Sequence, residues 1–307
     1  MKTLVPNYYK KFRCIADKCR HNCCVGWEID IDDDTLGYYS ELSGDFGKKV
    51  RQNIDFDDEC PHFILKEGDR CPFLAPDGLC EIIKRLGEDA LCDICADHPR
   101  FRNFFSEHTE MGLGLCCEEA ARIILSSDEP FELVPTDEDF AVCLDDQEKE
   151  MFDEREELFS IIRDRSVSVF ERMERIASKY SFELQDLFPE KLKDLYLSLE
   201  RLCEKWTDIL LAITSFDINK SILSDKKYSV CFEQLLCYLI FRHFADGMYD
   251  ERYIARIKFA LSGVFLVASL CDGIDDANAF DIAEMSRMLS SEIEYSEENL
   301  DKLFDSL

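Results

Sequence analysis

The cysteines of this chain are concentrated in its N-terminal part. Eleven of the sixteen lie within the first 117 residues. Ten of these stand in tight groups, which are Cys14, Cys19, Cys23, Cys24, Cys71, Cys80, Cys92, Cys95, Cys116 and Cys117. Grouped thiolates are soft ligands that suit zinc and iron–sulfur clusters. The grouping therefore predicts a metal centre whose ligands are drawn from these ten cysteines, and Cys60, which stands alone, is expected to be structural.

The gaps between the cysteines do not identify the metal. Structural zinc sites commonly use two CxxC pairs, and only Cys92 and Cys95 have that gap. The run Cys14, Cys19 and Cys23, with gaps of four and three residues, is closer to iron–sulfur spacing. Each of the two vicinal pairs is expected to provide one ligand and one bystander, or ligands to two sites. The pattern favours iron–sulfur over zinc and leaves both open.

The histidines are weaker candidates for the same chemistry. His98 follows the CxxC pair closely and precedes Pro99, so it is interpreted as a ligand, as a group that orients a ligand, or as a loop residue. The other nearby histidines, His21, His62 and His108, are expected to be surface or packing residues. No histidine is therefore included in the predicted ligand set.

Composition limits the partners of such a site. The formal charge is −29, from 36 basic and 65 acidic residues, which disfavours nucleic acid and anionic membranes as partners because both attract positive patches. The longest uncharged apolar stretch, residues 259–271, is too short to span a bilayer. We expect a cytoplasmic protein. In a reducing compartment clustered cysteines are more often metal ligands than disulfides.

The elements that must position the cysteines are predicted to be mainly α-helical. We expect an irregular cysteine-rich metal-binding domain over 1–126, an acidic linker over 127–146 and an all-helical bundle over 147–307. In the bundle, apolar residues recur at helical spacing, and helices are predicted over 162–180, 195–213, 229–245, 251–271, 278–290 and 296–306. Its single cysteines, Cys203, Cys231, Cys237 and Cys271, are expected to be buried and inert.

The cysteine-rich part is predicted to contain only short elements. Helices are expected over 33–53, 78–86, 88–97 and 114–126, and extended segments over 24–31 and 61–66. Gly112 and Gly114 are interpreted as a turn that opens a helix without a preceding strand, and therefore without a cofactor role. Ser291 and Glu294 have the spacing of a helix capping box.

Three blocks of this part closely resemble the flagellin lysine-N-methylase family. They are residues 6–32 (PNYYKKFRCIADKCRHNCCVGWEIDID), 70–83 (RCPFLAPDGLCEII) and 86–125, from LGEDALCDICADHPRFRNFF to GLGLCCEEAARIIL. A looser similarity links the CPFL block to a broad group of cysteine-cluster proteins that chelate zinc or iron. The resemblance implies methyl transfer from S-adenosylmethionine to lysine ε-amines of flagellin. It also implies an iron–sulfur cluster, of the 4Fe–4S type, with ligands drawn from the ten clustered cysteines; zinc is the alternative metal.

Methyl transfer sets chemical requirements that the sequence meets only in part. A lysine must lose its proton before its nitrogen attacks the methyl sulfonium, and the candidates for such a base in the three blocks are Tyr8, Tyr9, Glu28, Asp97, Glu118 and Glu119. None is singled out. The doubly wound sheet and glycine-rich turn that commonly hold S-adenosylmethionine are not recognisable, so an unconventional cofactor site is expected. A zinc-stabilised interaction module and an iron–sulfur redox protein are the alternative functions.

Overall fold

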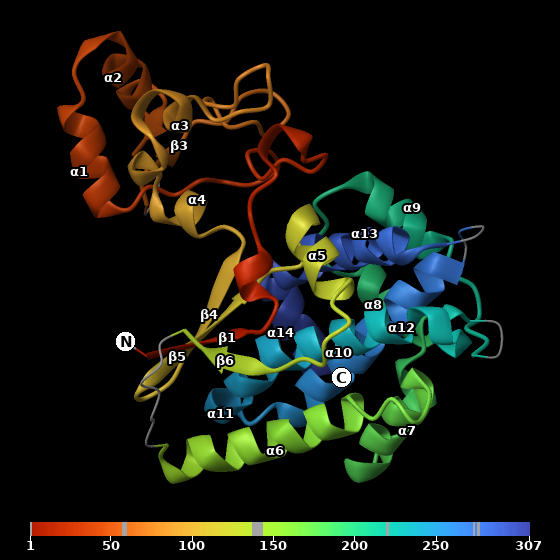
Figure 1. Ribbon diagram of the computed structural model, residues 1–307. Helices are drawn as coiled ribbons and strands as arrows, with labels where there is room; N and C mark the ends of the chain where they lie inside the picture. The colour runs from red at the N-terminus through yellow and green to blue at the C-terminus, as the bar shows by residue number, and fades with distance from the viewer. Residues whose placement is uncertain (1, 57–59, 137–143, 219–220, 273, 275–276) are drawn as a thin grey trace. The chain divides into compact units, whose positions relative to one another are not determined.

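The chain forms two compact units, which are described separately. A computed structural model (Figure 1) describes all residues except 1, 57–59, 137–143, 219–220, 273 and 275–276. The larger unit comprises Met1–Phe12 and Phe101–Leu307, and the smaller unit comprises Arg13–Arg100. These boundaries differ from those expected near 126 and 147, because the first residues of the chain pair with strands that follow the cysteine-rich segment.

A small mixed sheet lies in the larger unit and was not expected from the sequence. Its order is β4 (Arg100–Phe104), β5 (His108–Leu113), β1 (Lys2–Pro6) and β6 (Leu133–Pro135). β1 is parallel to β5, with Lys2 opposite His108, and antiparallel to β6. The strands all lie before residue 147, and every regular element described over 147–307 is helical, as expected for the bundle. β6 lies within the expected linker, of which residues 137–143 fall outside the described residues.

Several helices of the larger unit match the predicted ranges, whereas the helix over 146–162 was not among those predicted. The helices of this unit are α5 (Glu118–Leu125), α6 (Asp146–Ile162), α7 (Val169–Lys179), α8 (Pro189–Leu197), α9 (Glu204–Leu211), α10 (Ser229–His243), α11 (Gly247–Asp250), α12 (Tyr253–Asp272), α13 (Ala279–Leu289) and α14 (Glu297–Ser306). Capping boxes start three of them, at Asp145 with Glu148, at Ser168 with Glu171 and at Asn278 with Asp281. The predicted continuous helix over 195–213 is divided into α8 and α9.

Two predictions about local structure in this unit were wrong. Ser290–Glu294 continues α13 as a π-helical segment, so Ser291 is not a helix cap; Ser296 caps α14 instead. Gly112 lies in β5, so a strand does precede the Gly112–Gly114 segment. Pattern analysis missed this strand because its partner β1 lies about a hundred residues earlier in the chain.

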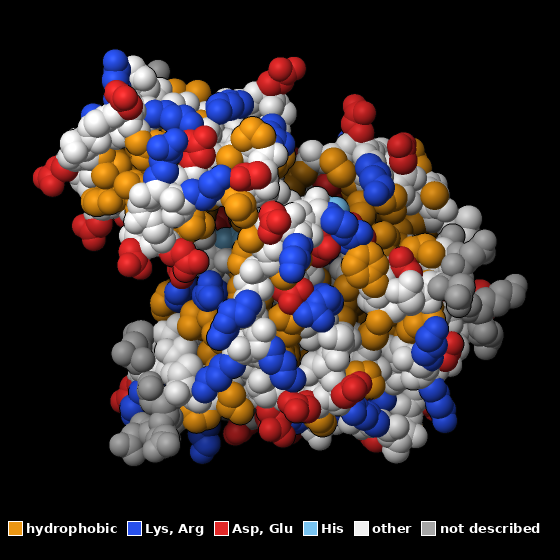
Figure 2. Space-filling model, turned by 45° about the horizontal axis from the view of Figure 1, so that its top comes forward, with side chains coloured by type: hydrophobic (Ala, Val, Ile, Leu, Met, Phe, Trp, Pro, Cys, Tyr) orange, Lys and Arg blue, Asp and Glu red, His pale blue; other side chains and the backbone are white. Residues whose placement is uncertain are grey.

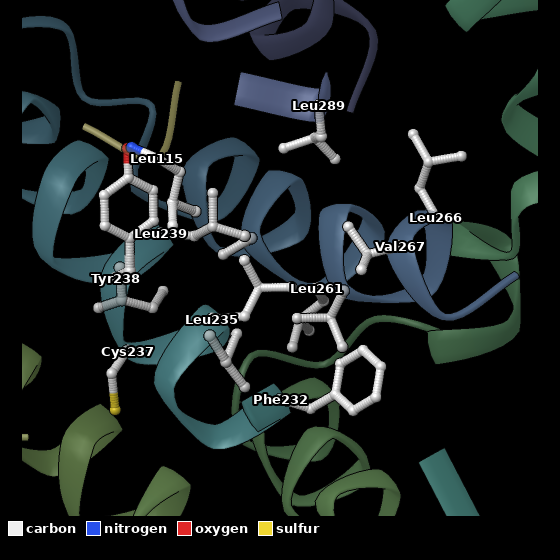
Figure 3. Packing of buried hydrophobic residues seen from close by; sticks show 14 of the residues in the cluster. Leu115, Phe232, Leu235, Cys237, Tyr238, Leu239, Leu261, Leu266, Val267 and Leu289 are labelled. Atoms are coloured by element: carbon white, nitrogen blue, oxygen red, sulfur yellow. The ribbon is translucent and has the colours of Figure 1, made fainter. Parts of the chain in front are cut away.

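The core of the larger unit is formed around α10 and α12. Most residues of both helices are buried, and Figure 3 shows Leu235 and Leu239 of α10 packed towards Leu261 of α12. α12 is long and apolar enough to cross a membrane by length and composition alone, but 78% of its apolar window is buried in the protein. This burial is that of a core helix, which is hydrophobic on all sides.

The smaller unit contains short helices and a two-stranded sheet. The elements are α1 (Asp33–Glu41), α2 (Gly44–Arg51), β2 (Ile54–Asp55), β3 (His62–Phe63), α3 (Glu81–Leu86) and α4 (Asp93–Asp97). The predicted helix over 33–53 is thus two helices, separated at Leu42 and Ser43. The core contains Tyr39, Phe63 and Phe73, with the Phe63 and Phe73 rings 4.9 Å apart. This core also includes two of the clustered cysteines.

The surface carries both signs of charge. On the face in view in Figure 2, basic and acidic side chains are interspersed over short distances. The net charge of −29 is therefore not gathered into a single acidic field on that face. Such interspersion is typical of a solvated surface and does not by itself indicate a partner.

Candidate metal centre

Six of the predicted ligands come together in the smaller unit. Cys71 and Cys92 belong to its core, with 5% and 1% of their surface exposed. Cys24, Cys80 and Cys95 pack against the same core, and Cys23 lies close enough to influence the pKa of Cys80 and of Cys95. The six come from the first and second cysteine groups, which are separated by about 50 residues of sequence. The fold therefore gathers groups that the sequence shows apart.

Cys24 links the two groups directly. Its thiol hydrogen-bonds the sulfurs of Cys23 and Cys71, and its backbone carbonyl accepts a 2.8 Å hydrogen bond from the Cys71 amide. The hydrogen bond from Cys24 lowers the pKa of Cys23 to about 7 and also lowers the pKa of Cys71. The pKa of Cys24 itself is raised, because it holds the shared proton. The three sulfurs therefore form one hydrogen-bonded set in which Cys24 is the donor.

A positive side chain and backbone amides further favour the thiolate at Cys71. Lys66 donates through Nζ to the carbonyl of Pro72 at 2.9 Å, and its charge acts to lower the pKa of Cys71. The amides of Phe73 and Leu74 act in the same direction. Amides two and three residues after a cysteine commonly orient a metal-bound sulfur, so this turn has the electrostatics of a thiolate ligand.

The second pair of thiols lies at the start of α4. Cys92 is the N-cap of this helix, and the Cys95 thiol donates to the Cys92 sulfur. That hydrogen bond lowers the pKa of Cys92 and raises the pKa of Cys95. Cys80 similarly precedes α3, where burial raises its pKa and the amides of Ile82 and Ile83 oppose that rise. Sulfurs at helix N-termini face positive peptide dipoles, which favour thiolates.

The other four predicted ligands have different surroundings. Cys14 is exposed and accepts a 3.4 Å hydrogen bond from the amide of Ala16, and Cys19 donates to the carbonyl of His21 at 3.2 Å. Cys116 and Cys117 belong to the larger unit.

Within the part of the chain that the structure describes, no three His, Cys, Asp or Glu side chains are arranged to hold a metal ion. The cysteines described are free thiols.

Cys116 lies beside a buried polar network that the sequence did not indicate. Its thiol is hydrogen-bonded to Tyr295, and burial raises its pKa to about 11. Arg242 lies over the Tyr295 ring at 5.0 Å and donates to the hydroxyl of Tyr238 at 2.8 Å. Glu294, which is buried, accepts from Tyr238 and from His243. The only signal in the sequence was the misread pair Ser291 and Glu294.

His98 packs on Trp27, which is hydrogen-bonded to the backbone of Cys23. The His98 ring meets the Trp27 ring edge to face, with centroids 5.0 Å apart, and the Trp27 indole donates to the carbonyl of Cys23 at 2.5 Å. Burial, followed by the charge of Arg100, lowers the pKa of His98 to about 4, so the ring is neutral at pH 7. The three interpretations of His98, as a ligand, as an orienting group and as a loop residue, all stay predictions.

Other single-residue expectations can be placed in the same way. His108 is buried and stacks on Phe105 at 4.8 Å, which confirms the packing role. Cys60 is exposed. Cys231, Cys237 and Cys271 are buried as expected, whereas Cys203 is exposed at the N-cap of α9, so its predicted burial was wrong.

The candidate bases differ in their access to a substrate. Tyr8 is fully buried, and burial raises its pKa well above the usual value. Glu119 is buried and held by both guanidinium nitrogens of Arg122, at 2.6 and 2.7 Å. Glu28 is more accessible and lies 3.9 Å from His62. Burial thus removes Tyr8 and Glu119 from the candidates that a substrate amine could reach directly.

The two units define a mainly helical protein with a thiol-rich smaller unit, and comparison with known proteins gives it relatives. Lysine-N-methylases of Salmonella typhimurium and Salmonella choleraesuis, and the flagellar biosynthetic protein FliU of Salmonella muenchen, are each 27% identical over 142 residues, which is 42% of this chain. The chain is distantly homologous to these proteins. The match spans 33% of the length of each methylase and 79% of FliU. No family model matches the chain, and no solved structure matches it significantly.

Proposed function

We propose that this protein transfers methyl groups from S-adenosylmethionine to lysine ε-amines of flagellin. The observation that carries the proposal is the similarity to lysine-N-methylases over 142 residues, together with the similarity to a flagellar biosynthetic protein. S-adenosylmethionine is the methyl donor that a lysine methylase of this kind implies. Because the match spans a third of each methylase, the activity and substrate of the whole chain are part of the proposal.

The proposal includes a thiolate metal centre in the smaller unit. Its support is the donor set, because Cys23, Cys24 and Cys71 share protons while the Cys95 thiol donates to Cys92. Thiols whose pKa is lowered by hydrogen bonds from neighbouring thiols suit an iron–sulfur cluster or zinc, and binding would displace the shared protons. The ligands would be drawn first from these residues and Cys80. Cys14, Cys19, Cys116 and Cys117 remain candidates for further ligands.

The chain must supply positioning and proton transfer for this reaction. Methyl transfer requires a neutral amine, an in-line approach to the methyl carbon and exclusion of water from the sulfonium. An iron–sulfur cluster would supply a charged, polarisable group against which the cofactor could be held. Tyr9, Glu28, Asp97 and Glu118 remain the candidates for the base from the recognised blocks, since burial sets Tyr8 and Glu119 aside.

To test the proposal, anaerobically prepared protein is incubated with S-adenosylmethionine and purified flagellin. The flagellin peptides are then analysed by mass spectrometry. Added methyl mass on lysines is the expected result. The matched control replaces flagellin with an unrelated lysine-rich protein, which should stay unmodified. Flagellin without added methyl mass, from protein that carries its full metal complement, would contradict the proposal.

A structural role for the metal is the second candidate, and one observation favours it. Cys71 and Cys92 are part of the core of the smaller unit, where a bound zinc ion would hold loops that contain few regular elements. In this reading the helical unit recruits a partner and no methyl transfer occurs. Iron and sulfide content per chain separates the two, because stoichiometric zinc without sulfide would favour the structural role.

A further inference from the structure

We propose that Asp32 and Tyr39 are positioning residues that hold the Cys92–Cys95 pair in place for the metal centre. This inference rests on the metal centre included in the proposed function. Both residues belong to the start and middle of α1, and each bonds the backbone on one side of Cys92. Neither residue is a metal ligand in this account; both act through the loop that carries the thiols.

Asp32 uses its two carboxylate oxygens for two different helices. Oδ1 accepts a 2.8 Å hydrogen bond from the Thr35 amide, which caps α1. Oδ2 accepts a 2.9 Å hydrogen bond from the amide of Asp93, the residue that directly follows Cys92. One side chain therefore joins the N-terminus of α1 to the N-terminus of α4.

Tyr39 fixes the other side of the same loop. Its hydroxyl donates to the carbonyl of Ala90 at 2.6 Å, and the residue is fully buried. Its ring stacks on Phe63 in the core of the unit, with centroids 6.1 Å apart. The Tyr39 carbonyl in turn accepts from Arg51 of α2 at 3.2 Å. The segment from Ala90 to Asp93 is therefore tied to a packed part of the unit.

The loop needs such external support. α4 spans only Asp93–Asp97, and a helix of this length has little stability of its own because nucleation is costly. Cys92 is nevertheless 1% exposed, so its sulfur is held in one direction. The Asp32 carboxylate also acts to raise the pKa of Cys92. Its charge opposes a thiolate there, and its contribution is therefore the geometry of its two hydrogen bonds.

The test separates helix capping from loop positioning. Asp32→Ser retains an N-cap oxygen for Thr35 but cannot also reach the Asp93 amide, and Asp33→Ser is the control because Asp33 is exposed and adjacent. Tyr39→Phe removes the hydroxyl and keeps the ring, and Tyr38→Phe is its control because Tyr38 is 45% exposed. The full-length proteins are loaded anaerobically with iron and sulfide, and in parallel with zinc alone.

The first readout is the rate at which a chelator removes the metal. Loss of a group that orients a ligand typically costs about 10- to 100-fold in metal affinity, so stripping of Asp32→Ser and Tyr39→Phe is expected to be faster by about that factor. The two controls should match the wild type. Equal rates of metal removal from Asp32→Ser and Asp33→Ser would overturn the proposal, provided that circular dichroism shows equal helical content in the two proteins.

The second readout needs no metal. Iodoacetamide labelling of the metal-free proteins, quantified by mass spectrometry, compares buried Cys92 with exposed Cys60. Cys92 should be labelled faster in Asp32→Ser and Tyr39→Phe, with Cys60 unchanged. Unchanged Cys92 labelling in both variants would overturn the positioning role. A wild-type protein that binds neither iron nor zinc would instead contradict the metal centre, while the labelling still decides whether the two side chains hold the loop.

Discussion

The hydroxyl of Tyr238 donates to Oε2 of Glu294 at 3.0 Å and accepts a 3.2 Å hydrogen bond from the amide of Leu115. Figure 3 shows the Tyr238 hydroxyl beside that nitrogen. The contact joins α10 and the π-helical segment to the backbone that directly precedes Cys116. The buried network of the larger unit therefore fixes the start of the last cysteine pair.

Tyr238→Phe is expected to destabilise the larger unit by about 1–3 kcal/mol, because the variant leaves a buried amide and a buried carboxylate each without one partner. The measurement is urea unfolding followed by fluorescence of Trp206, which is buried in this unit, in a Trp27→Phe background. Tyr249→Phe is the control, since Tyr249 is 73% exposed. Equal midpoints for the two variants would contradict the role of the network.

Acid should weaken the larger unit through Glu294. Burial raises the pKa of Glu294. Interactions with Arg242, His243 and Ser290 outweigh that effect and lower the pKa from 4.5 to about 2. A depressed carboxyl pKa stabilises the fold above the unfolded value, and that contribution is lost as the pH falls from about 4.5 towards about 2. The shift corresponds to about 3 kcal/mol.

His243 acts in the same direction at higher pH. Burial is the largest cause of its lowered pKa, so the folded state favours the neutral ring, and stability is lost as the pH falls below the unfolded value of 6.5. Trp206 fluorescence during urea unfolding at pH 7, 5 and 3 measures both effects. An unfolding free energy that is the same at pH 7 and pH 3 would show that the two groups do not stabilise the fold in this way.

Close packing at the end of β5 is sensitive to a single methyl group. A Cβ on Gly112 would lie 2.2 Å from the Phe101 ring and 2.7 Å from the Phe241 ring. Gly112→Ala should therefore cost about 1–3 kcal/mol of unfolding free energy. Gly37→Ala is the contrasting variant, because a Cβ there has no neighbour within 4 Å and lies in α1. Gly37→Ala should stabilise the smaller unit by up to about 1 kcal/mol. Changes in unfolding free energy of the same sign in the two variants would contradict this account of the packing.

The core thiols should control metal content, and the isolated thiol should not. Cys71→Ser and Cys92→Ser are expected to lose most of the bound metal, because each removes a buried sulfur that accepts a hydrogen bond from a neighbouring thiol. Cys60→Ser should retain it. Iron, zinc and sulfide are measured per chain after anaerobic loading. Full metal content in both core variants would place the centre elsewhere among the ten cysteines.

Much of the helical architecture could be predicted because its signal is local. α10, α12, α13 and α14 follow apolar spacing that a single window of sequence contains. The pairing of β1 with β5 could not be predicted, because its strands are short and separated by about a hundred residues. The division into units could not be predicted for the same reason, since that pairing brings the first residues of the chain to the larger unit.

The candidate site shows the same difference between local and long-range information. Spacing predicted that Cys92 and Cys95 lie together, and their hydrogen bond confirms it, whereas their role as metal ligands stays a prediction. Spacing did not show that Cys24 contacts Cys71, because that contact depends on a backbone bridge between distant loops. The role of Asp32 was hidden for a related reason. The acidic run around Asp32 indicates the start of a helix. Its hydrogen bond to the Asp93 amide joins two helices, and the sequence gives no sign of it.

The most direct test of the proposed function is transfer of an isotopically labelled methyl group. Metal-loaded protein is mixed with flagellin and S-adenosylmethionine labelled in its methyl group, in the absence of oxygen. The account predicts that label appears on flagellin lysines, and that it falls sharply with Cys71→Ser protein. Absence of label on flagellin, with wild-type protein of full metal content and confirmed binding of S-adenosylmethionine, would contradict it.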